Sequence, residues 1–291
     1  MEATLDCPDY LVIGTVCQDL TDEGPIIGGT VAYSGLTANN LGCRTAAITS
    51  FADDFAFAEL LSDLQVVRQP SAATTTYQNV YVDGHRQQYV RAVAGKIENS
   101  LVPDAWRGAK IVQVGPLVQE VRLDIVELFP HSLIGVTPQG WMRQWDEAGR
   151  VYPALWTPSK DELRRVRALI LSEEDVGGDL SRVEDYARLV EIVVLTSGWK
   201  GSSVYWRGHV TYIPARDVRE VDPTGAGDIY AAAFLVRLHE TNDPLEAAYF
   251  ANQVASCSVE RKGIAGIPTP QEIAECKKMR YTAARTVTVP T

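Results

Sequence analysis

Short apolar runs recur along most of the chain and alternate with stretches of helical periodicity. The six runs that we predict to be strands are 10–15, 46–50, 110–115, 133–137, 168–172 and 192–197. Most are apolar at every position, which is typical of strands that helices cover on both faces. The pattern predicts an α/β fold with a doubly wound, mainly parallel sheet flanked by helices, formed by residues 1–291 as a single domain.

Helical patterns fill the segments between these runs. We expect helices at 31–41, 53–61, 118–128, 160–166 and 180–189. Two longer helical patterns, 224–239 and 244–261, follow in the last third of the chain. They are rich in Ala, Ser and Gly, and such small side chains let helices pack closely on a sheet or on each other.

One section breaks the parallel pattern. Residues 74–82 and 86–93 are rich in Thr, Tyr and Val and flank Asp83-Gly84, which predicts an antiparallel hairpin. The hairpin either extends an edge of the sheet or forms a lid over the carboxyl ends of the strands. In the second case, segments of about 14–30 and 74–94 would form a small β lid that excludes water from a site.

Charge and cysteine content narrow the class of partner. Lys and Arg number 27 against 37 Asp and Glu, so the net charge of −10 disfavours nucleic acid and anionic membranes as partners. Five scattered cysteines without CxxC spacing favour a reduced chain over a disulfide framework. Because the first ten residues lack a basic start and no apolar run approaches ~18 residues, we expect a cytoplasmic protein.

The sequence Asp222-Pro-Thr-Gly-Ala-Gly-Asp228 carries the clearest chemistry. Gly225, Ala226 and Gly227 form a turn at the start of an apolar helical pattern. The glycines let consecutive backbone amides turn toward one point, and the helix dipole adds positive potential there. The turn is therefore a candidate anion site, and a phosphoryl group fits it.

Asp228 lies in the first turn of the same helix, next to the candidate anion site. A carboxylate beside a bound phosphate is unfavourable unless it has a chemical role, such as accepting a proton from an attacking hydroxyl. The simpler interpretation is that Asp228 caps the helix and that the glycines only form a turn.

At these residues the sequence resembles the ribokinase-like, or PfkB-type, carbohydrate kinases, whose signature is Asp-Thr-x-Gly-Ala-Gly-Asp. The resemblance extends over roughly residues 10–270 and implies a ribokinase-like fold. It implies that Asp228 is the general base for the acceptor hydroxyl. It also implies that Gly225, Ala226 and Gly227 bind the transferring phosphoryl group.

The same resemblance assigns an acceptor site near the start of the chain. Asp19 matches the family's sugar-contacting acid, and Gly28-Gly29 matches its amino-terminal Gly-Gly signature. Tyr33 stands where many sugar kinases have Asn, so an aromatic wall is expected to replace an amide that reads hydroxyl groups.

On the donor side, Thr196, Gly198 and Gly201 are similar to the family's Thr-x-Gly-x-x-Gly nucleotide loop. Asn252 and Gly263 correspond to the helix beside the adenine and to the loop that follows it. The implied co-substrate is ATP.

Acidic residues imply metal ions. In Ser172-Glu-Glu-Asp175, Glu174 and Asp175 match the Asn-x-x-Glu motif that organises Mg²⁺, with Ser172 replacing Asn and Asp175 replacing Glu. Asp222 and Thr224 are similar to residues that hold a monovalent cation in several relatives, so K⁺ is a further candidate.

These observations predict an ATP-dependent phosphotransferase for a hydroxyl of a small sugar, polyol or nucleoside. Motifs of other phosphate-binding classes, the P-loop, the protein-kinase loop and the dinucleotide fingerprint, do not occur. One alternative is a ribokinase-like ligand-binding or regulatory protein with weak catalysis. Another is a hydroxymethylpyrimidine-type kinase, which the Gly28-Gly29 region and the 74–93 hairpin disfavour. A lid hairpin also makes a homodimer a candidate assembly.

Overall fold

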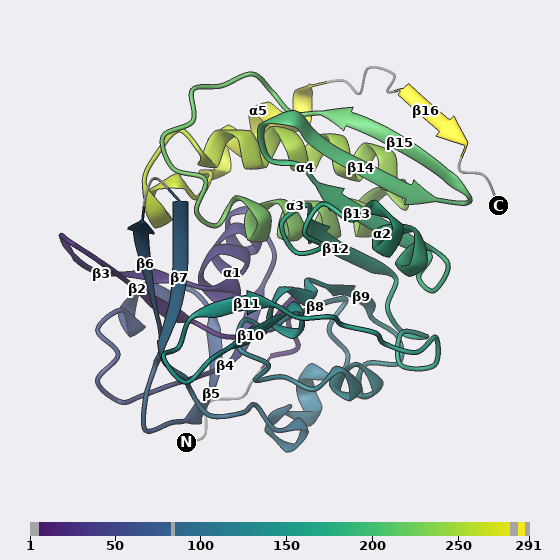
Figure 1. Cartoon of the computed structure of the whole chain (residues 1–291). Helices are drawn as coiled ribbons and strands as arrows, with labels where there is room; N and C mark the ends of the chain where they lie inside the picture. Colours follow the sequence, from purple (N-terminus) through teal and green to yellow (C-terminus); the bar gives the residue numbers. More distant parts are fainter. Residues whose placement is uncertain (1–5, 83–84, 280–284, 289–291) are drawn as a thin grey trace.

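The computed structural model describes the chain except for residues 1–5, 83–84, 280–284 and 289–291. Within the described residues, the main sheet has ten strands, and a smaller sheet stands at one side of it (Figure 1). The main sheet runs in the order β16 (Arg285–Thr288), β15 (His209–Pro214), β14 (Gly201–Trp206), β13 (Ile192–Thr196), β12 (Ala168–Ser172), β9 (Leu133–Val136), β8 (Ile111–Gly115), β1 (Tyr10–Gly14), β4 (Thr45–Phe51) and β5 (Gln65–Pro70).

The strands from β5 to β13 are parallel, and β14, β15 and β16 continue the sheet in antiparallel pairs. All six strands predicted from the sequence are confirmed within a residue or two. From β1 the chain first builds outward through β4 and β5, then returns to β8 on the other side of β1. The topological switch point is therefore at the carboxyl ends of the neighbouring strands β1 and β8, and open α/β sheets bind ligands at such a point.

Each strand of the sheet centre is apolar on both faces because each face has its own core. In β1, Tyr10 and Val12 belong to one hydrophobic cluster and Leu11 and Ile13 to the other. Successive side chains of a strand point to opposite faces, so a strand buried on both sides needs an uninterrupted apolar run. The doubly wound α/β arrangement is confirmed.

The two faces differ in how they are covered. The cluster of Tyr10 and Val12 packs against four helices, and the other cluster packs against one helix and short 3₁₀ turns. The four are α1 (Thr30–Asn40), α3 (Ala226–Thr241), α4 (Pro244–Ser258) and α5 (Pro270–Lys278), and the single helix is α2 (Leu180–Ala187).

Three predicted helices are wrong. Of 53–61 only η1 (Ala58–Leu61) is 3₁₀-helical, of 118–128 only η4 (Leu123–Leu128), and 160–166 forms turns. Near 118, the Glu120 carboxylate accepts the backbone amide of Val118 at 2.8 Å, and such side-chain bonds compete with helix formation. All three segments are also shorter than a helix needs to be stable without extensive packing.

The remaining elements are short 3₁₀ turns and a two-stranded ribbon. The other 3₁₀ turns are η2 (Asn99–Leu101), η3 (Asp104–Trp106), η5 (Pro138–Met142), η6 (Gly198–Lys200) and η7 (Gly263–Gly266). A two-stranded ribbon consists of β10 (Arg143–Trp145) and β11 (Val151–Pro153).

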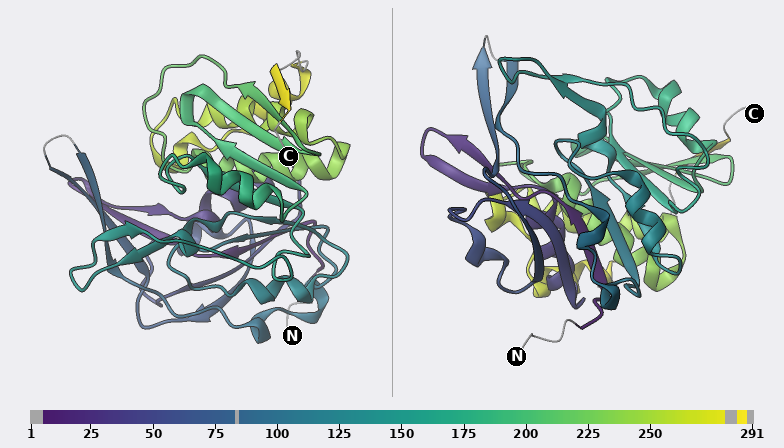
Figure 2. Two further views of the ribbon diagram at one scale, coloured as in Figure 1. Left: turned by 45° about the vertical axis from the view of Figure 1, so that its right-hand side comes forward. Right: turned by 90° about the horizontal axis from the view of Figure 1, so that it is seen from below.

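The smaller sheet confirms the predicted hairpin and extends it. It runs in the order β3 (Gly24–Gly28), β2 (Cys17–Thr21), β6 (Thr75–Val82) and β7 (His85–Ala92). Strands β6 and β7 pair in antiparallel register, and both views of Figure 2 show them projecting beyond the main sheet. The predicted turn at Asp83-Gly84 lies outside the described residues.

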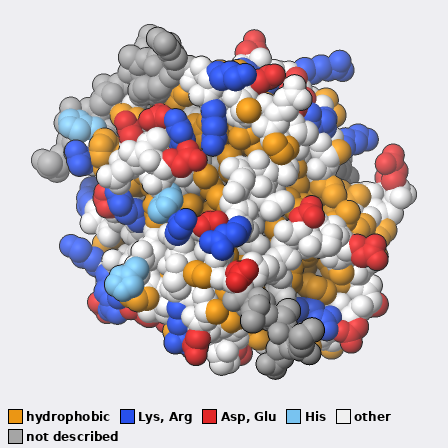
Figure 3. All heavy atoms as spheres, turned by 180° about the vertical axis from the view of Figure 1, so that it is seen from behind, with side chains coloured by type: hydrophobic (Ala, Val, Ile, Leu, Met, Phe, Trp, Pro, Cys, Tyr) orange, Lys and Arg blue, Asp and Glu red, His pale blue; other side chains and the backbone are white. Residues whose placement is uncertain are grey.

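Basic and acidic side chains are interspersed on the face opposite that of Figure 1, which Figure 3 shows as spheres. In the part of the chain that the structure describes, we find no helix long and apolar enough to cross a bilayer.

Candidate active site

The carboxyl ends of β1 and β8 approach each other closely at the switch point. Gly14 lies opposite Gly115, and a Cβ on Gly14 would lie 2.3 Å from the Gly115 carbonyl oxygen. A Cβ on Gly115 would lie 2.5 Å from Cγ2 of Thr30, the first residue of α1. The two glycines therefore allow the strand ends and the start of α1 to meet.

The predicted Gly-Ala-Gly turn forms the N-terminus of α3. Gly225 precedes the helix in a left-handed conformation (φ 78°), and Ile229 N–H donates to the Gly225 carbonyl at 2.9 Å. The amides of Gly227 and Asp228 precede that bond, at the positive end of the helix dipole. This geometry is suited to an anionic group such as a phosphoryl group.

Asp222 holds the turn to a distant loop. Its carboxylate accepts the Thr224 amide and the Gly263 amide, each at 2.9 Å. Burial opposes ionisation of Asp222, but the hydrogen bonds from Thr224 and Gly263 and the charge of Lys262 lower its pKa below the ordinary value. The Val259 carbonyl, just beyond α4, accepts the Asp222 amide at 3.0 Å. The turn, the end of α4 and η7 are thus joined by hydrogen bonds.

Tyr33 lies under this turn instead of facing open space. Its side chain is 1% exposed, and a Cβ on Gly225 would lie 2.3 Å from the Tyr33 ring. The hydroxyl is buried without a hydrogen-bond partner among the described residues and lies about 4 Å from where a Gly263 Cβ would be. In this conformation Tyr33 presents no face to a ligand, which does not favour the expected aromatic wall.

Asp228 is partly exposed in the first turn of α3, and its carbonyl accepts the Ser34 hydroxyl at 2.9 Å. Desolvation raises the pKa of Asp228 to about 6; a hydrogen bond with Thr30 and the charge of Arg143 oppose the shift, and the charge of Asp175 adds to it. At pH 7 such a carboxylate is ionised yet accepts a proton readily, which suits a general base.

Arg143 is a charged neighbour of Asp228 that the sequence analysis missed. It is the first residue of β10, it is partly buried, and its charge also acts on the hydroxyl of Tyr77 of β6, which donates to the Leu117 carbonyl at 2.9 Å. Its positive charge favours the ionised forms of Asp228 and Cys17. In a chain of net charge −10, Arg143 supplies the local positive charge that an anionic ligand needs.

The expected acceptor residues lie on the smaller sheet and next to it. Asp19 is on β2, and its Oδ2 lies so close to Gly28 that a Cβ on that glycine would be 2.5 Å from it. Gly29 (φ 97°) leads directly into α1, and a Cβ there would lie 2.5 Å from the Thr15 carbonyl oxygen. Gly29 is required by its left-handed φ and by its contact with backbone atoms, whereas a side chain at Gly28 would displace the carboxylate of Asp19.

The expected donor loop follows β13. Thr196 ends that strand, and Gly198 (φ 56°) is exposed at the start of η6. Gly201 (φ 116°) is buried, and a Cβ there would lie 2.2 Å from the Ile213 carbonyl oxygen. The exposed turn η6 at the carboxyl end of β13 therefore begins at Gly198, and the partly buried Thr196 and the buried Gly201 lie on either side of it.

Asn252 lies deeper than expected for a nucleotide contact. It is 4% exposed, and its amide nitrogen donates to the Ile213 carbonyl at 3.0 Å and to Ser202 Oγ at 3.2 Å. Asn252 therefore holds α4 against β14 and β15.

The acidic sequence after β12 forms a local hydrogen-bonded turn. Asp175 Oδ2 accepts from the Ser172 amide and hydroxyl, each at 2.8 Å, and Glu174 is exposed. Glu173 is the acid that contacts the donor loop: Glu173 accepts the Ser197 hydroxyl at 2.8 Å and lies 3.7 Å from the Lys200 ammonium nitrogen. No three His, Cys, Asp or Glu side chains in the described ranges are grouped to hold a metal ion by themselves.

The structure thus gathers many of the expected residues around the start of α3. Asp19, Asp222 and Asp228 all raise the pKa of Tyr33 above its usual range, after burial itself, and Asp175 acts in the same way on Asp228. No contact in the described part of the chain joins Asn252 or Glu174 to these residues. No sequence motif pointed to the missed residue, Arg143, because it lies far from Asp228 along the chain and outside any shared pattern.

The fold and this glycine turn with an adjacent acid define a phosphotransferase of the ribokinase type. The chain belongs to the pfkB family of carbohydrate kinases, whose family model matches residues 28–271. It is a kinase of the ribokinase family, whose members phosphorylate sugars, polyols or nucleosides.

Curated relatives act on different acceptors. Inositol 3-kinase of Arabidopsis thaliana is 24% identical over 267 residues, which cover 87% of this chain and 74% of the relative. Cytidine kinase of Thermococcus kodakarensis is 27% identical over 267 residues, which cover 82% and 91%.

Solved structures show the same fold. A pyrophosphate-dependent kinase of the ribokinase family superposes with a TM-score of 0.78 at 22% identity, covering 92% of this chain and 99% of that one. Arabidopsis thaliana ribokinase complexed with ribose and ATP superposes with a TM-score of 0.71 at 18% identity, covering 94% and 100%. The phosphoryl donor differs between these two kinases, since the first depends on pyrophosphate and the second is complexed with ATP. The predicted ribokinase-like fold and the predicted enzyme class are confirmed.

Proposed function

We propose that the protein transfers the γ-phosphoryl group of ATP to one hydroxyl of a small polyol, sugar or nucleoside, with Asp228 as the general base. The observation that supports this proposal is the position of Asp228: it lies beside the amides that open α3, and its pKa is raised to about 6. A group that takes up a proton just below neutral pH, next to an anion site, matches the needs of phosphoryl transfer.

In the proposed step, the acceptor hydroxyl oxygen attacks the γ-phosphorus in line. Its proton passes to a carboxylate oxygen of Asp228, and the bond from the γ-phosphorus to the β–γ bridging oxygen breaks to release ADP. Amides of Gly225 and Gly227 would stabilise charge on the transferring group, whereas the Ala226 amide, also expected there, already donates to the Pro223 carbonyl at 3.1 Å. Arg143, whose charge acts on Asp228, would add a positive charge to the site.

We propose that Asp19, Gly28 and Gly29 orient the acceptor. The Asp19 carboxylate, lying against Gly28, would accept hydrogen bonds from acceptor hydroxyls. The smaller sheet that carries Asp19 would then act as a lid, since Tyr77 of that sheet also reaches Arg143. Leu20 and Ile26 are exposed on the same sheet, and we propose this surface as the contact of a homodimer.

We propose that Thr196, Gly198, Gly201 and Gly263 line the donor site. The residues present fit Mg²⁺ in part: Asp175 and Glu174 offer the oxygen ligands that Mg²⁺ prefers, and ATP phosphates would supply the others. Bound Mg²⁺ would offset the charge of the phosphates. The residues fit K⁺ poorly, because both Asp222 oxygens already accept backbone amides, Thr224 at Oδ1 and Gly263 at Oδ2.

Pyrophosphate is a second candidate donor. One observation favours it: Asn252, expected beside the adenine, is buried and its amide is bonded to backbone and Ser202. A donor without a base would need no contact from Asn252.

The proposal is tested by incubating the full chain with Mg²⁺, either ATP or pyrophosphate, and a panel of myo-inositol, ribose, fructose and cytidine. Phosphorylated product is followed by phosphorus NMR, and Asp228→Asn is the control. We expect product with at least one acceptor and little with Asp228→Asn. An acceptor that raises the Tm but yields no product with either donor would support the binding-protein alternative.

A further inference from the structure

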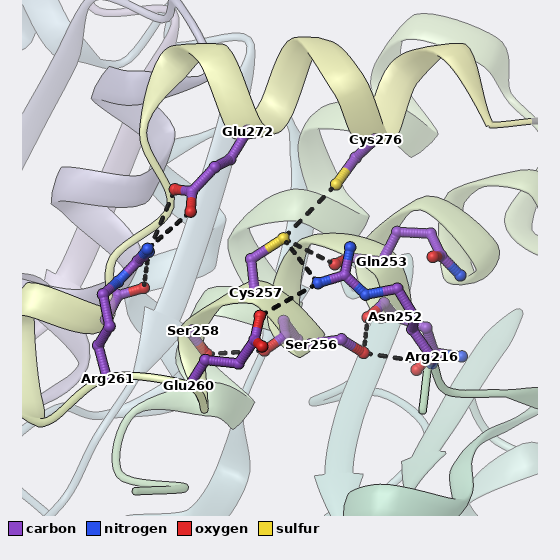
Figure 4. A network of polar contacts seen from close by, with 12 residues as sticks. Arg216, Asn252, Gln253, Ser256, Cys257, Ser258, Glu260, Arg261, Glu272 and Cys276 are labelled. Atoms are coloured by element: carbon purple, nitrogen blue, oxygen red, sulfur yellow. Dashed lines mark hydrogen bonds and ion pairs between the residues drawn. The ribbon is translucent and has the colours of Figure 1, made fainter. Parts of the chain in front are cut away.

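Cys257 and Cys276 form a pair of thiols on the helical side of the molecule. Cys257 lies in the last turn of α4 and Cys276 in the last turn of α5, and their sulfur atoms are 3.8 Å apart (Figure 4). Glu272 of α5 also contacts the loop after α4, since its carboxylate accepts two hydrogen bonds from Arg261 at 2.6 and 3.1 Å. The thiols are therefore held close together by their helices.

Arg216 gives one of these thiols a charged partner. Its Nη2 lies 3.6 Å from Cys257 Sγ, and Figure 4 shows the guanidinium directed at that sulfur. A hydrogen bond from Cys276 lowers the pKa of Cys257, burial opposes this change, and the charge of Arg216 adds to the lowering. The thiolate is the reactive form of cysteine, and a nearby cation favours it.

Both thiols are buried, but one of them lines a hollow at the surface. Cys257 is 4% exposed and Cys276 2%, so large reagents are excluded. Cys276 nevertheless lines a hollow of about 440 Å³ at the surface, together with Phe250, Lys277 and Met279. Cys257 does not line this hollow, so an oxidant would reach its sulfur by passing the Cys276 side chain. A small oxidant is the reagent that fits such an approach.

We propose that Cys257 and Cys276 are a site of reversible oxidation that hydrogen peroxide converts to a disulfide. The Cys257 thiolate attacks a peroxide oxygen, the O–O bond breaks, and Cys257 becomes a sulfenic acid while hydroxide takes up a proton to leave as water. The Cys276 sulfur then attacks the Cys257 sulfur, its thiol proton passes to the departing hydroxyl, and a second water leaves. The two thiols lose two electrons in all, and one peroxide is reduced to two waters.

Bond formation requires the sulfur atoms to close from 3.8 Å to about 2.05 Å. Rotation of the two side chains, together with a small shift of the helix ends that carry them, would supply this movement. The product would fix α5 to the end of α4.

The oxidised pair would affect the candidate active site through two neighbours. Arg216 precedes the segment that leads to the Gly225 turn, and it would lose its thiolate partner. Val259, two residues after Cys257, accepts the amides of Val221 and Asp222 at 2.7 and 3.0 Å. We expect oxidation to lower the kcat/KM for phosphoryl transfer several-fold. Disulfide formation itself does not depend on the proposed function.

The test is treatment of the full chain with hydrogen peroxide, alkylation of the remaining thiols, and mass spectrometry of tryptic peptides. Trypsin cuts between the two cysteines at Arg261 and Lys262. We expect the two cysteine peptides to be joined with the loss of two hydrogens, and dithiothreitol to separate them. If the peptides are joined but kcat/KM is unchanged, the oxidation site is supported and its proposed effect on the Gly225 turn is overturned.

Variants separate the roles of the residues. Cys276→Ser should leave Cys257 as a sulfenic acid that a dimedone probe captures. Arg216→Gln should slow disulfide formation several-fold, whereas Glu260→Gln should not slow it, because Glu260 only shares the Arg216 guanidinium at 3.4 Å. Cys43→Ser is the matched control and should leave the joined peptide intact. Full alkylation of both thiols after peroxide, in protein that keeps its native Tm, would overturn the proposal.

Discussion

The ring of Tyr33 lies directly against Gly225, so that a Cβ at position 225 would come within 2.3 Å of it. Gly225 also has a φ of 78°, which side-chain-bearing residues rarely adopt. An aromatic ring of α1 therefore sets the position of the candidate anion turn. Two independent constraints require glycine at the first position of that turn.

Gly225→Ala should reduce both stability and phosphoryl transfer. The left-handed backbone alone costs about 1 kcal/mol with alanine, and the contact with Tyr33 adds to this cost. Gly227→Ala is the matched control, because a Cβ there meets nothing within 4 Å and the residue is helical. Thermal unfolding should show a drop in Tm for Gly225→Ala only; equal Tm values for the two variants would contradict this account of the turn.

Tyr33→Phe should leave the Tm equal to or higher than that of the natural protein. The variant removes a buried hydroxyl that has no hydrogen-bond partner among the described residues, and burying such a group costs stability. The kcat and the acceptor KM should change little, since the side chain is 1% exposed. A large rise in the acceptor KM would instead show that Tyr33 takes part in binding the acceptor, although the sequence analysis expected its ring and not its hydroxyl to do so.

Activity should fall as the pH drops through about 6, because protonation of Asp228 removes the base. The stability changes in the opposite direction. An acid whose pKa is higher in the folded than in the unfolded state favours folding below its unfolded pKa, and this contribution is lost as the pH rises through about 6. Asp228→Asn should therefore raise the free energy of unfolding at pH 7 by the order of 1 kcal/mol while abolishing most turnover.

That pair of results separates a base from a helix cap. If Asp228 only stabilised the start of α3, Asp228→Asn would lower the Tm and leave most turnover. Denaturant unfolding at pH 5 and pH 8, with kcat at the same values, makes the distinction.

Arg143→Ala should lower kcat/KM about 10-fold or more, the usual effect of losing a hydrogen bond to a charged group. It should also move the acid limb of the pH–rate profile to higher pH, because the Arg143 charge lowers the pKa of Asp228. Gln144→Ala is the control, since Gln144 is the exposed next residue of β10. An unchanged pH profile in Arg143→Ala would remove Arg143 from the site.

The sequence predicted the centre of the sheet well and its covering less well. Strands such as β1 were found because burial on both faces demands an unbroken apolar run. Strands β14 and β15 were missed, since their polar positions alternate less regularly and the turn at Arg207-Gly208, with φ of 51° and 75°, carries no Asn.

Site residues that belong to one local motif were also predictable. Asp222, Gly225 and Asp228 lie within seven positions of one another, and a helix start brings them together. Arg143 comes from a ribbon that only the fold places near α3, so no local pattern reports it. The burial of Tyr33 and Asn252 likewise depends on how α1 and α4 pack, which single-residue patterns do not encode.

The antiparallel pair α3–α4 has a consequence for how the molecule opens. These two helices make the most extensive contact of any two described elements, and most of their residues are fully enclosed. Segments of that kind exchange their amide protons last, often only when the whole protein unfolds. The proposed base is therefore mounted on the most persistent segment of the protein, while Asp19 is carried on a projecting sheet that can fluctuate without disturbing it.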